Sequence, residues 1–222
     1  MTYPIAGVQQ LSLEYVFDPS LSGGIAGAIR VDYLECGGAT IRAKIDVSQT
    51  NWKALHAANS NCTGPVTDFD WHIHTKWENT AASAFTTGCS LALTGNHYDP
   101  ALACGPNSEH IGDSCKPIVA SPGFKYACTP MHYSCNPKVC ERGDLSGKLG
   151  KMHAENGWIR EKWYDPHYPA FEEATAAWNM LLHATCGSTS VRLVCATATA
   201  AKDLPKTAQP IDTTIPTTYS PY

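Results

Sequence analysis

Several short stretches of the chain alternate between apolar and polar residues with a period of two. They are residues 11–17 (LSLEYVF), 28–33 (AIRVDY) and 190–196 (SVRLVCA). Such alternation is typical of β-strands with one buried face, because successive side chains point to opposite sides. Glycines and prolines between these runs favour turns, so the pattern predicts an antiparallel β-sandwich or barrel. The positions predicted to face the core are Leu11, Leu13, Tyr15, Phe17, Ile29, Val31, Tyr33, Val191, Leu193 and Cys195, with Arg192 and Val194 on the opposite face.

Two further stretches carry histidines. Residues 68–77 read DFDWHIHTKW, and in a strand His72 and His74 point the same way while Trp71 and Ile73 point toward the core. Neutral imidazole binds copper, zinc, iron and nickel, although two histidines on a solvated strand face are the ordinary alternative. Residues 169–184 (PAFEEATAAWNMLLHA) are the one stretch that can be argued as a helix, and the end of that stretch fits a strand equally well.

The ten cysteines indicate disulfides rather than a zinc ribbon. Their spacings are long and irregular, and no two are arranged as CxxC. A high, even count predicts up to five disulfides in a secreted protein. Five of the ten lie between residues 98 and 142, which otherwise show little strand pattern, so we expect a long loop pinned by disulfides there. The sequon at 61–63 (NCT) contains one of the cysteines, Cys62.

Composition narrows the class of protein. The net charge is −4 and charged residues make up 16%, which argues against a nucleic-acid partner. No apolar run reaches the length of about 18 residues expected of a membrane span. The first residues lack the segments of a signal peptide, which predicts a start after a removed leader. Residues 203–222 are rich in proline and threonine and predict a linker or stalk after a domain at 1–202.

Other polar residues could take part in a reaction or bind a ligand, but each also has an ordinary structural explanation. His97 lies in a turn framed by glycine and proline (GNHYDP, 95–100), where histidines are usually exposed. Glu141 and Asp144 lie in CERGDLSGKLG (140–150), which could be a polar turn or a source of carboxylates that orient a ligand histidine. For His183 in NMLLHATC the ordinary explanation is a partly buried residue at the edge of the core, and for Arg192 it is a charge on the surface.

Taken in chain order, these pieces resemble the Cu/Zn superoxide dismutase family. The resemblance spans roughly residues 7–199 and is carried by WHIH (71–74), TGCSLALTGNHYDP (87–100), ERGDLSGKLG (141–150), LLHA (181–184) and VRLVCA (191–196). The family's fold is an eight-stranded Greek-key β-barrel, in agreement with the strand pattern. The resemblance implies an enzyme that converts superoxide to oxygen and hydrogen peroxide, with copper cycling between Cu(II) and Cu(I).

Residue by residue, the resemblance also implies a site. His72, His74, His97 and His183 would bind copper, Cys89 and Cys195 would form a disulfide, and Arg192 would guide superoxide. His97 would also deliver protons in the second half of the reaction.

Two departures from the ordinary family point to its extracellular copper-only branch, known from fungi and oomycetes. Glu141 stands just before GDL, where ordinary members have a zinc histidine, and only eight residues separate His183 from Arg192, where they insert a long charged loop. WYDP (163–166) resembles that branch too. The resemblance then implies that zinc is absent and that Glu141, with Asp144, supports His97 in place of zinc.

Two alternatives remain open at this point. One is a secreted copper-binding or scaffold domain of the same fold without dismutase activity. The other is a Cu/Zn enzyme in which His110 or His132 enters a rearranged zinc site. The resemblance further implies a monomer that is secreted and that could be attached to the cell surface through the C-terminal stalk.

Overall fold

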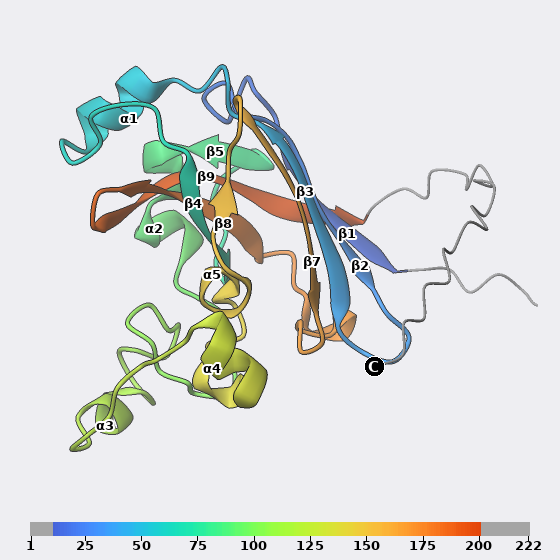
Figure 1. The fold of residues 1–222 in the computed structure, drawn as a ribbon, viewed down its shortest axis with the longest axis vertical. Helices are drawn as coiled ribbons and strands as arrows, with labels where there is room; N and C mark the ends of the chain where they lie inside the picture. The colour runs from blue at the N-terminus through green and yellow to red at the C-terminus, as the bar shows by residue number, and fades with distance from the viewer. Residues whose placement is uncertain (1–10, 201–222) are drawn as a thin grey trace, which may run out of the picture.

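The computed structural model describes residues 11–200, and these form an antiparallel β-barrel with few helices (Figure 1). The predicted stalk at 203–222 and the predicted domain boundary after residue 202 lie outside the described residues. The strands of the described part are β1 Ser12–Phe17, β2 Ala26–Tyr33, β3 Ala39–Asp46, β4 Asp68–His74, β5 Ser83–Phe85, β6 Met152–His153, β7 Trp158–Asp165, β8 Asn179–Cys186 and β9 Thr189–Ala200.

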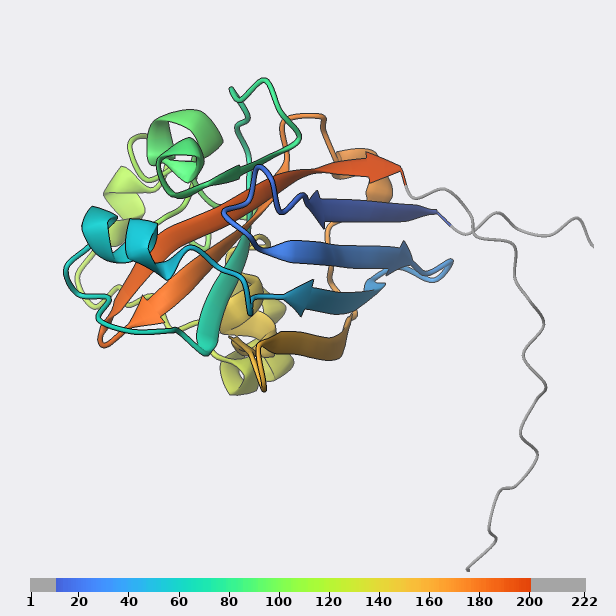
Figure 2. The ribbon, with the colours of Figure 1, turned by 90° about the horizontal axis from the view of Figure 1, so that it is seen from above.

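Eight strands follow the order β6-β4-β8-β9-β1-β2-β3-β7, and β5 pairs with β9 outside this path. A tight turn, in which Glu155 and Trp158 pair, joins the two end strands β6 and β7, so the barrel is nearly closed. Seen from above, β1, β2, β3 and β7 form one wall, and β4 and β8 lie across from them (Figure 2). The predicted eight-stranded barrel is therefore confirmed.

The period-two pattern predicted part of the core. Tyr15, Phe17, Ile29 and Val31 are buried within the barrel, beside the unpredicted strand β3 and its Ile41. Burying such side chains stabilises the fold by about 1.5–3 kcal/mol each. Leu11 was predicted to face the core as well, but it precedes β1 and is 43% exposed.

The predicted facing of β9 holds for Leu193, which is buried in the main core, and is wrong beyond it. A β-bulge shifts the register so that Leu182 pairs with Val194 while His183 pairs with Arg192. The extra residue in the bulge reverses the facing of everything after it. Val194 therefore enters the main core, and Cys195 turns away into a small cluster with Cys89 and Leu181.

Helices are short and lie outside the barrel. The helical interpretation of 169–184 is wrong, since the segment contains only the single turn η3 (Phe171–Glu173) before β8. In the described residues no helix is long and apolar enough to cross a membrane. The remaining helical segments are α1 Trp52–Ala58, η1 Thr86–Cys89, α2 Leu91–Thr94, α3 Lys116–Val119, α4 Pro130–Cys135, η2 Pro137–Val139 and α5 Leu145–Leu149.

The segment from 98 to 142 is the predicted disulfide-pinned loop. This segment forms a lobe beside the barrel, and the lobe contains α3 and α4 (Figure 1). Disulfides Cys104–Cys115 and Cys128–Cys140 close two short loops within it. Cys62–Cys186 and Cys89–Cys195 tie loops to the last two strands. Four disulfides form, and Cys36 and Cys135 are exposed free thiols.

Candidate metal centre

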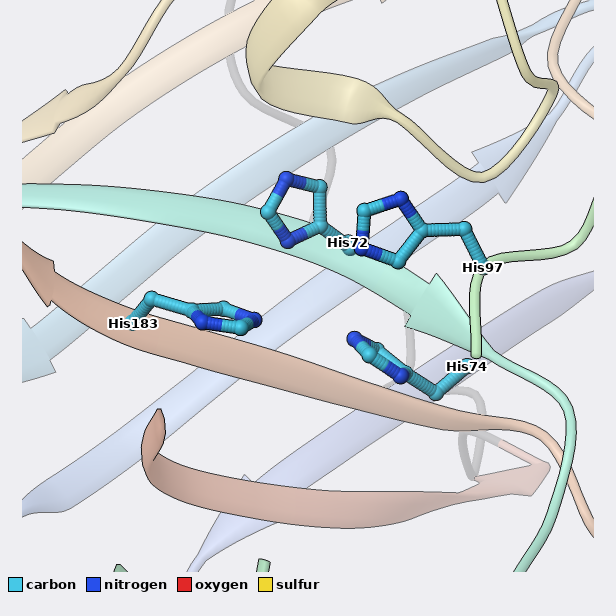
Figure 3. Close-up of side chains that lie close together, drawn as sticks. All are labelled: His72, His74, His97 and His183. Atoms are coloured by element: carbon cyan, nitrogen blue, oxygen red, sulfur yellow. The ribbon is translucent and has the colours of Figure 1, made fainter. Parts of the chain in front are cut away.

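Four histidines meet on the outer side of β4 and β8. His72 and His74 point outward from β4, His183 comes from β8, and His97 lies in the segment after α2, where its backbone pairs with His74. Figure 3 shows the four rings turned toward one another. His72 and His97 stack with their centroids 4.1 Å apart. The period-two alternation of β4 thus sends Trp71 and Ile73 into the core and both histidines to the site.

One nitrogen of each ring could reach a common ion. The four histidines each offer a nitrogen, and these atoms all lie within 4.8 Å of one another. The buried ring nitrogens without a hydrogen-bond partner are His72 Nδ1, His74 Nε2, His97 Nε2 and both nitrogens of His183. Buried polar atoms normally have partners, so this concentration of unsatisfied acceptors is the pattern expected of a metal site.

The remaining nitrogens of three rings are oriented by the protein. His74 Nδ1 donates to the carbonyl oxygen of Gly95 at 2.8 Å. His97 Nδ1 forms a hydrogen bond of 2.6 Å with Glu141 Oε2. His72 Nε2 lies 3.5 Å from Asp144 Oδ1. Such contacts fix the tautomer and the angle of a ligand histidine.

Burial keeps the imidazoles neutral. It is the main cause that lowers the pKa of His72, His74 and His183, and the positive charge of neighbouring imidazoles adds to it. Burial likewise lowers the pKa of His97 to about 4. At neutral pH each ring therefore has one nitrogen with a lone pair and carries no positive charge, which is what a metal ligand requires.

The two carboxylates beside the histidines differ in electrostatics. Burial raises the pKa of Glu141 to about 8, and the negative charge of Asp144 adds to this. Burial would also raise the pKa of Asp144, but its contacts with His72, the charge of His97 and the backbone N–H of Gly147 hold that pKa well below its usual range. Asp144 is thus the fixed negative charge, and Glu141 is the carboxyl that can gain or lose a proton.

Tyr126 links the Asp144 carboxylate to the backbone of Glu141, and sequence reasoning missed it. Its hydroxyl donates to Asp144 Oδ2 at 2.8 Å and accepts from the backbone N–H of Glu141 at 3.1 Å. A Cβ at Gly105 would collide with the Glu141 carboxylate and the Tyr126 ring, so a side chain there would displace both. No local pattern could have found Tyr126, because it lies in the irregular loop.

Backbone contacts attach this loop to β4. Ile73 N donates to Gly143 O at 2.9 Å, Gly143 N to Tyr98 O at 2.7 Å, and Tyr98 N to Ile73 O at 3.0 Å. Any side chain at Gly143 would collide with the backbones of Ile73 and Tyr98, so the glycine allows the close approach. Asp99, also in the GNHYDP stretch, accepts hydrogen bonds from the backbone of Ala103 and Cys104 and shapes the turn after His97.

A buried ion pair holds the other end of the same loop. Lys148 Nζ lies 2.6 Å from Asp165 Oδ2 and 2.9 Å from the carbonyl oxygen of Arg142. Both side chains of the pair are almost fully buried, and the Tyr133 hydroxyl also donates to Asp165. The pair connects α5, whose N-cap is Asp144, to the end of β7. GDLSGK and WYDP, two stretches of the resemblance, thus meet in this pair.

Arg192 lines the open side of the centre. Its guanidinium donates to Thr94 Oγ1 at 2.6 Å, to Cys89 O at 3.1 Å and to Gly95 O at 3.0 Å. Burial lowers its pKa to about 10, so it stays positive at neutral pH. It shares a cavity of about 730 Å³ with His72, His97 and His183. A small anion in that cavity would find Arg192 beside the histidines.

The alternative zinc histidines are not brought to the site. His110 lies near Glu109 and Asp113, and His132 is exposed on α4, where its ring contacts Ala127 O. In the described residues the only other cluster with metal-binding atoms joins Asp99 to Cys104 and Cys115. Those two cysteines form a disulfide, so no thiolate is available there.

Four neutral imidazole nitrogens fit copper. Imidazole suits copper, zinc, iron and nickel, and a set of four nitrogens suits the tetragonal preference of Cu(II). The donor set has no thiolate and no carboxylate oxygen among the atoms that converge.

Comparisons with known proteins support the fold. No family model matches the chain, and no curated protein matches it in sequence. Solved structures of Candida albicans superoxide dismutase 5 do match. The Cu(II) form is 20% identical, with a TM-score of 0.52, over 90% of this chain and 99% of that chain. The chain has a superoxide dismutase fold.

Other solved structures of the same Candida protein are single-residue variants. One with a glutamate replaced is 19% identical, with a TM-score of 0.52, over 91% of this chain and 98% of that chain. Another has an aspartate replaced three positions later. Within the superoxide dismutase fold of the present chain, Glu141 and Asp144 have the same spacing.

Proposed function

We propose that this protein is a secreted, copper-only superoxide dismutase. The observation that carries the proposal is the set of four buried, neutral imidazoles with at least one unsatisfied nitrogen each, beside a positive Arg192 in the same cavity. The superoxide dismutase fold supports it. Copper bound there would supply the one-electron chemistry that oxidises one superoxide and reduces another.

The protein's own residues would attract and orient the substrate. The whole chain carries a net charge of −4, so long-range attraction of an anion is weak and the local charge of Arg192 is needed. Three hydrogen bonds hold the guanidinium in place. The cavity wall thus presents a fixed positive charge where superoxide would approach.

His97 is the residue suited to move a proton. Its Nε2 faces the other histidines, while its Nδ1 is held by Glu141 at 2.6 Å. A ring anchored at one nitrogen can exchange a proton at the other without losing its orientation. Glu141 would therefore do for His97 what a zinc ion on Nδ1 would otherwise do.

The copper-only part of the proposal rests on that same contact. Glu141 occupies the Nδ1 side of His97, and neither His110 nor His132 lies beside it. Secretion is supported by the four disulfides, which are typical of oxidising compartments. We propose a monomer, which light scattering of the purified protein would test.

The deciding experiment measures metal content and dismutase activity on one copper-reconstituted sample. We expect one copper and no zinc per chain, with activity. His74→Gln should lose both copper and activity, whereas His132→Gln, the matched control outside the centre, should keep both. If the copper-loaded protein had no activity, the proposal of an enzyme would be overturned in favour of a copper-binding scaffold. One zinc per chain beside copper would overturn the copper-only assignment.

A further inference from the structure

The wall of the barrel opposite the metal centre concentrates positive charge. On the outer face of β2, β3 and β7, Arg30 pairs in register with Arg42, and Arg42 with Lys162. One row further along, Lys44 pairs with Arg160. Side chains two positions apart on a strand lie on the same face of the sheet, so all five cations point outward together. We refer to these five residues as the cationic face.

Carboxylates neutralise only part of this face. Asp32 is almost buried and holds Arg30, at 2.8 Å, together with Arg42. Glu14 lies directly opposite Arg30 on β1, and Asp46 lies two residues beyond Lys44 on the same face of β3, so three carboxylates stand among the five cations. The face therefore keeps an excess of positive charge, although the whole chain carries a net charge of −4.

Three of the cations are exposed and have no ion pair with any residue of 11–200: Lys44, Arg160 and Lys162. The register places Lys44 directly opposite Arg160, and Lys162 directly opposite Arg42. Like charges in directly opposed cross-strand positions destabilise a sheet. A bound polyanion would turn this repulsion into attraction.

The cationic face also has a hollow that could hold an extended polymer. A hollow of about 640 Å³ runs over the small residues Ala26 and Ala28. It is bordered by Trp158, by the cations of β2 and β3, and by the carboxylates of Glu14 and Asp46. The Arg160 guanidinium lies 4.2 Å from the centre of the Trp158 ring, and Tyr164 is 58% exposed on the same strand. Flat aromatic rings beside cations suit sugar rings that carry acidic groups.

We propose that the cationic face binds an acidic polysaccharide. Membrane surfaces take up apolar side chains as well as cations, and among the described residues the only large aliphatic side chain exposed on this face is Val16. The four disulfides suit the extracellular setting in which such polysaccharides occur. Binding would fasten the protein to an extracellular matrix.

The placement leaves the metal centre accessible. Three of the four histidines lie on β4 and β8, across the barrel from β2 and β3 (Figure 2), and His97 packs against them. A polysaccharide on the cationic face would therefore not cover Arg192 or the cavity beside it. This inference stands without the proposed function, because binding can be measured on the protein whatever its activity.

The test is calorimetric titration of the full chain with dextran sulfate at low salt. A triple variant, Lys44→Gln, Arg160→Gln and Lys162→Gln, should bind about 100-fold more weakly, from roughly fivefold per cation. The matched control changes three exposed lysines elsewhere: Lys53→Gln, Lys116→Gln and Lys125→Gln. It should change affinity no more than a few-fold. Equal weakening in both variants, or no binding by the wild type, would overturn the proposal.

Two further measurements separate this face from a general anion binder. Relief of the like-charge pairs should leave the melting temperature of the triple variant unchanged or higher, which excludes misfolding as the cause of weak binding. Trp158→Ala keeps every charge and should weaken binding to dextran sulfate without changing its salt dependence. Unchanged affinity in Trp158→Ala, or equally tight binding to phosphatidylserine vesicles, would overturn the polysaccharide assignment.

Discussion

The metal centre has two halves that are built differently. His72, His74 and His183 belong to adjacent strands, where the ladder between β4 and β8 sets their positions. His97 and the carboxylates belong to connecting segments, which contain only short helices and are held by cross-links. We refer to these as the strand half and the loop half of the centre.

The difference shows where the geometry of each half is decided. In a strand, odd and even positions face opposite sides of the sheet. The histidines of the strand half therefore need only the correct pairing register to meet. The loop half has no such repeat. It depends on two disulfides, on the Ile73–Gly143–Tyr98 backbone contacts and on a buried ion pair. Changes to those supports should therefore act on His97 and Glu141 while leaving the strands folded.

Loss of the buried ion pair should have the largest effect. Lys148→Met leaves Asp165 buried without its cation, and we expect the free energy of unfolding to fall by about 3–5 kcal/mol. Copper affinity should fall as well, because α5 and its N-cap Asp144 lose their attachment to β7. Urea denaturation and copper titration check the two effects.

The exposed pair Lys76–Glu78 provides the control. Its ions lie 3.0 Å apart on the surface, and Lys76→Met should cost about 1 kcal/mol or less. Hydrogen exchange sharpens the comparison: in Lys148→Met, protection should fall further in 98–150 than in β8. If β8 lost protection equally, the two halves would not be separable.

The next largest effect concerns Glu141 and pH. A protonated Glu141 donates to His97 Nδ1 and leaves the ring's own proton on Nε2, the atom that faces the centre. Because burial raises the pKa of Glu141 to about 8, copper binding below that pH must expel a proton. Copper affinity should then fall roughly tenfold per pH unit below about 8 and be flat above it.

Glu141→Gln removes the titrating group. We expect its copper affinity above pH 8 to be about 10–100-fold weaker than in the wild type, with a pH slope smaller by one proton. The gap between the two proteins should therefore narrow as pH falls. Competition with a chelator across the pH range measures both slopes, and Glu172→Gln, at an exposed glutamate, is the control. Identical slopes in wild type and Glu141→Gln would contradict the proton linkage.

The contrast between the halves also explains what the sequence could predict. Alternation around residues 68–77 predicted a strand with both histidines on one side, and this arrangement is local. The β9 bulge was not predictable, because it arises from a mismatch in pairing with β8 rather than from any pattern within 190–196. It nonetheless places Arg192 opposite His183 and turns Cys195 toward Cys89.

Long-range contacts account for most of what was missed in the loop half. Lys148 and Asp165 both lie in stretches used for the family resemblance, but nothing in their spacing indicates that they form a buried pair. Tyr126 and Gly105 meet Glu141 only because the disulfides fold the loop back. The resemblance itself, rather than any periodicity, named Glu141 as the partner of His97.

The smallest predicted effect tests how finely the loop half is positioned. Tyr126→Phe removes a donor to Asp144 and an acceptor for the Glu141 backbone N–H. Burial raises the pKa of Tyr126, so its hydroxyl stays a donor at all working pH values. We expect copper affinity to fall about tenfold or less, the equivalent of one ordinary hydrogen bond of about 0.5–1.5 kcal/mol. Tyr164→Phe, at an exposed tyrosine, should change nothing. Because Tyr126 acts on the centre only through its contacts with Asp144 and Glu141, the double variant with Glu141→Gln should lose less than the two single effects combined. Full additivity would show that Tyr126 acts on the centre by another route.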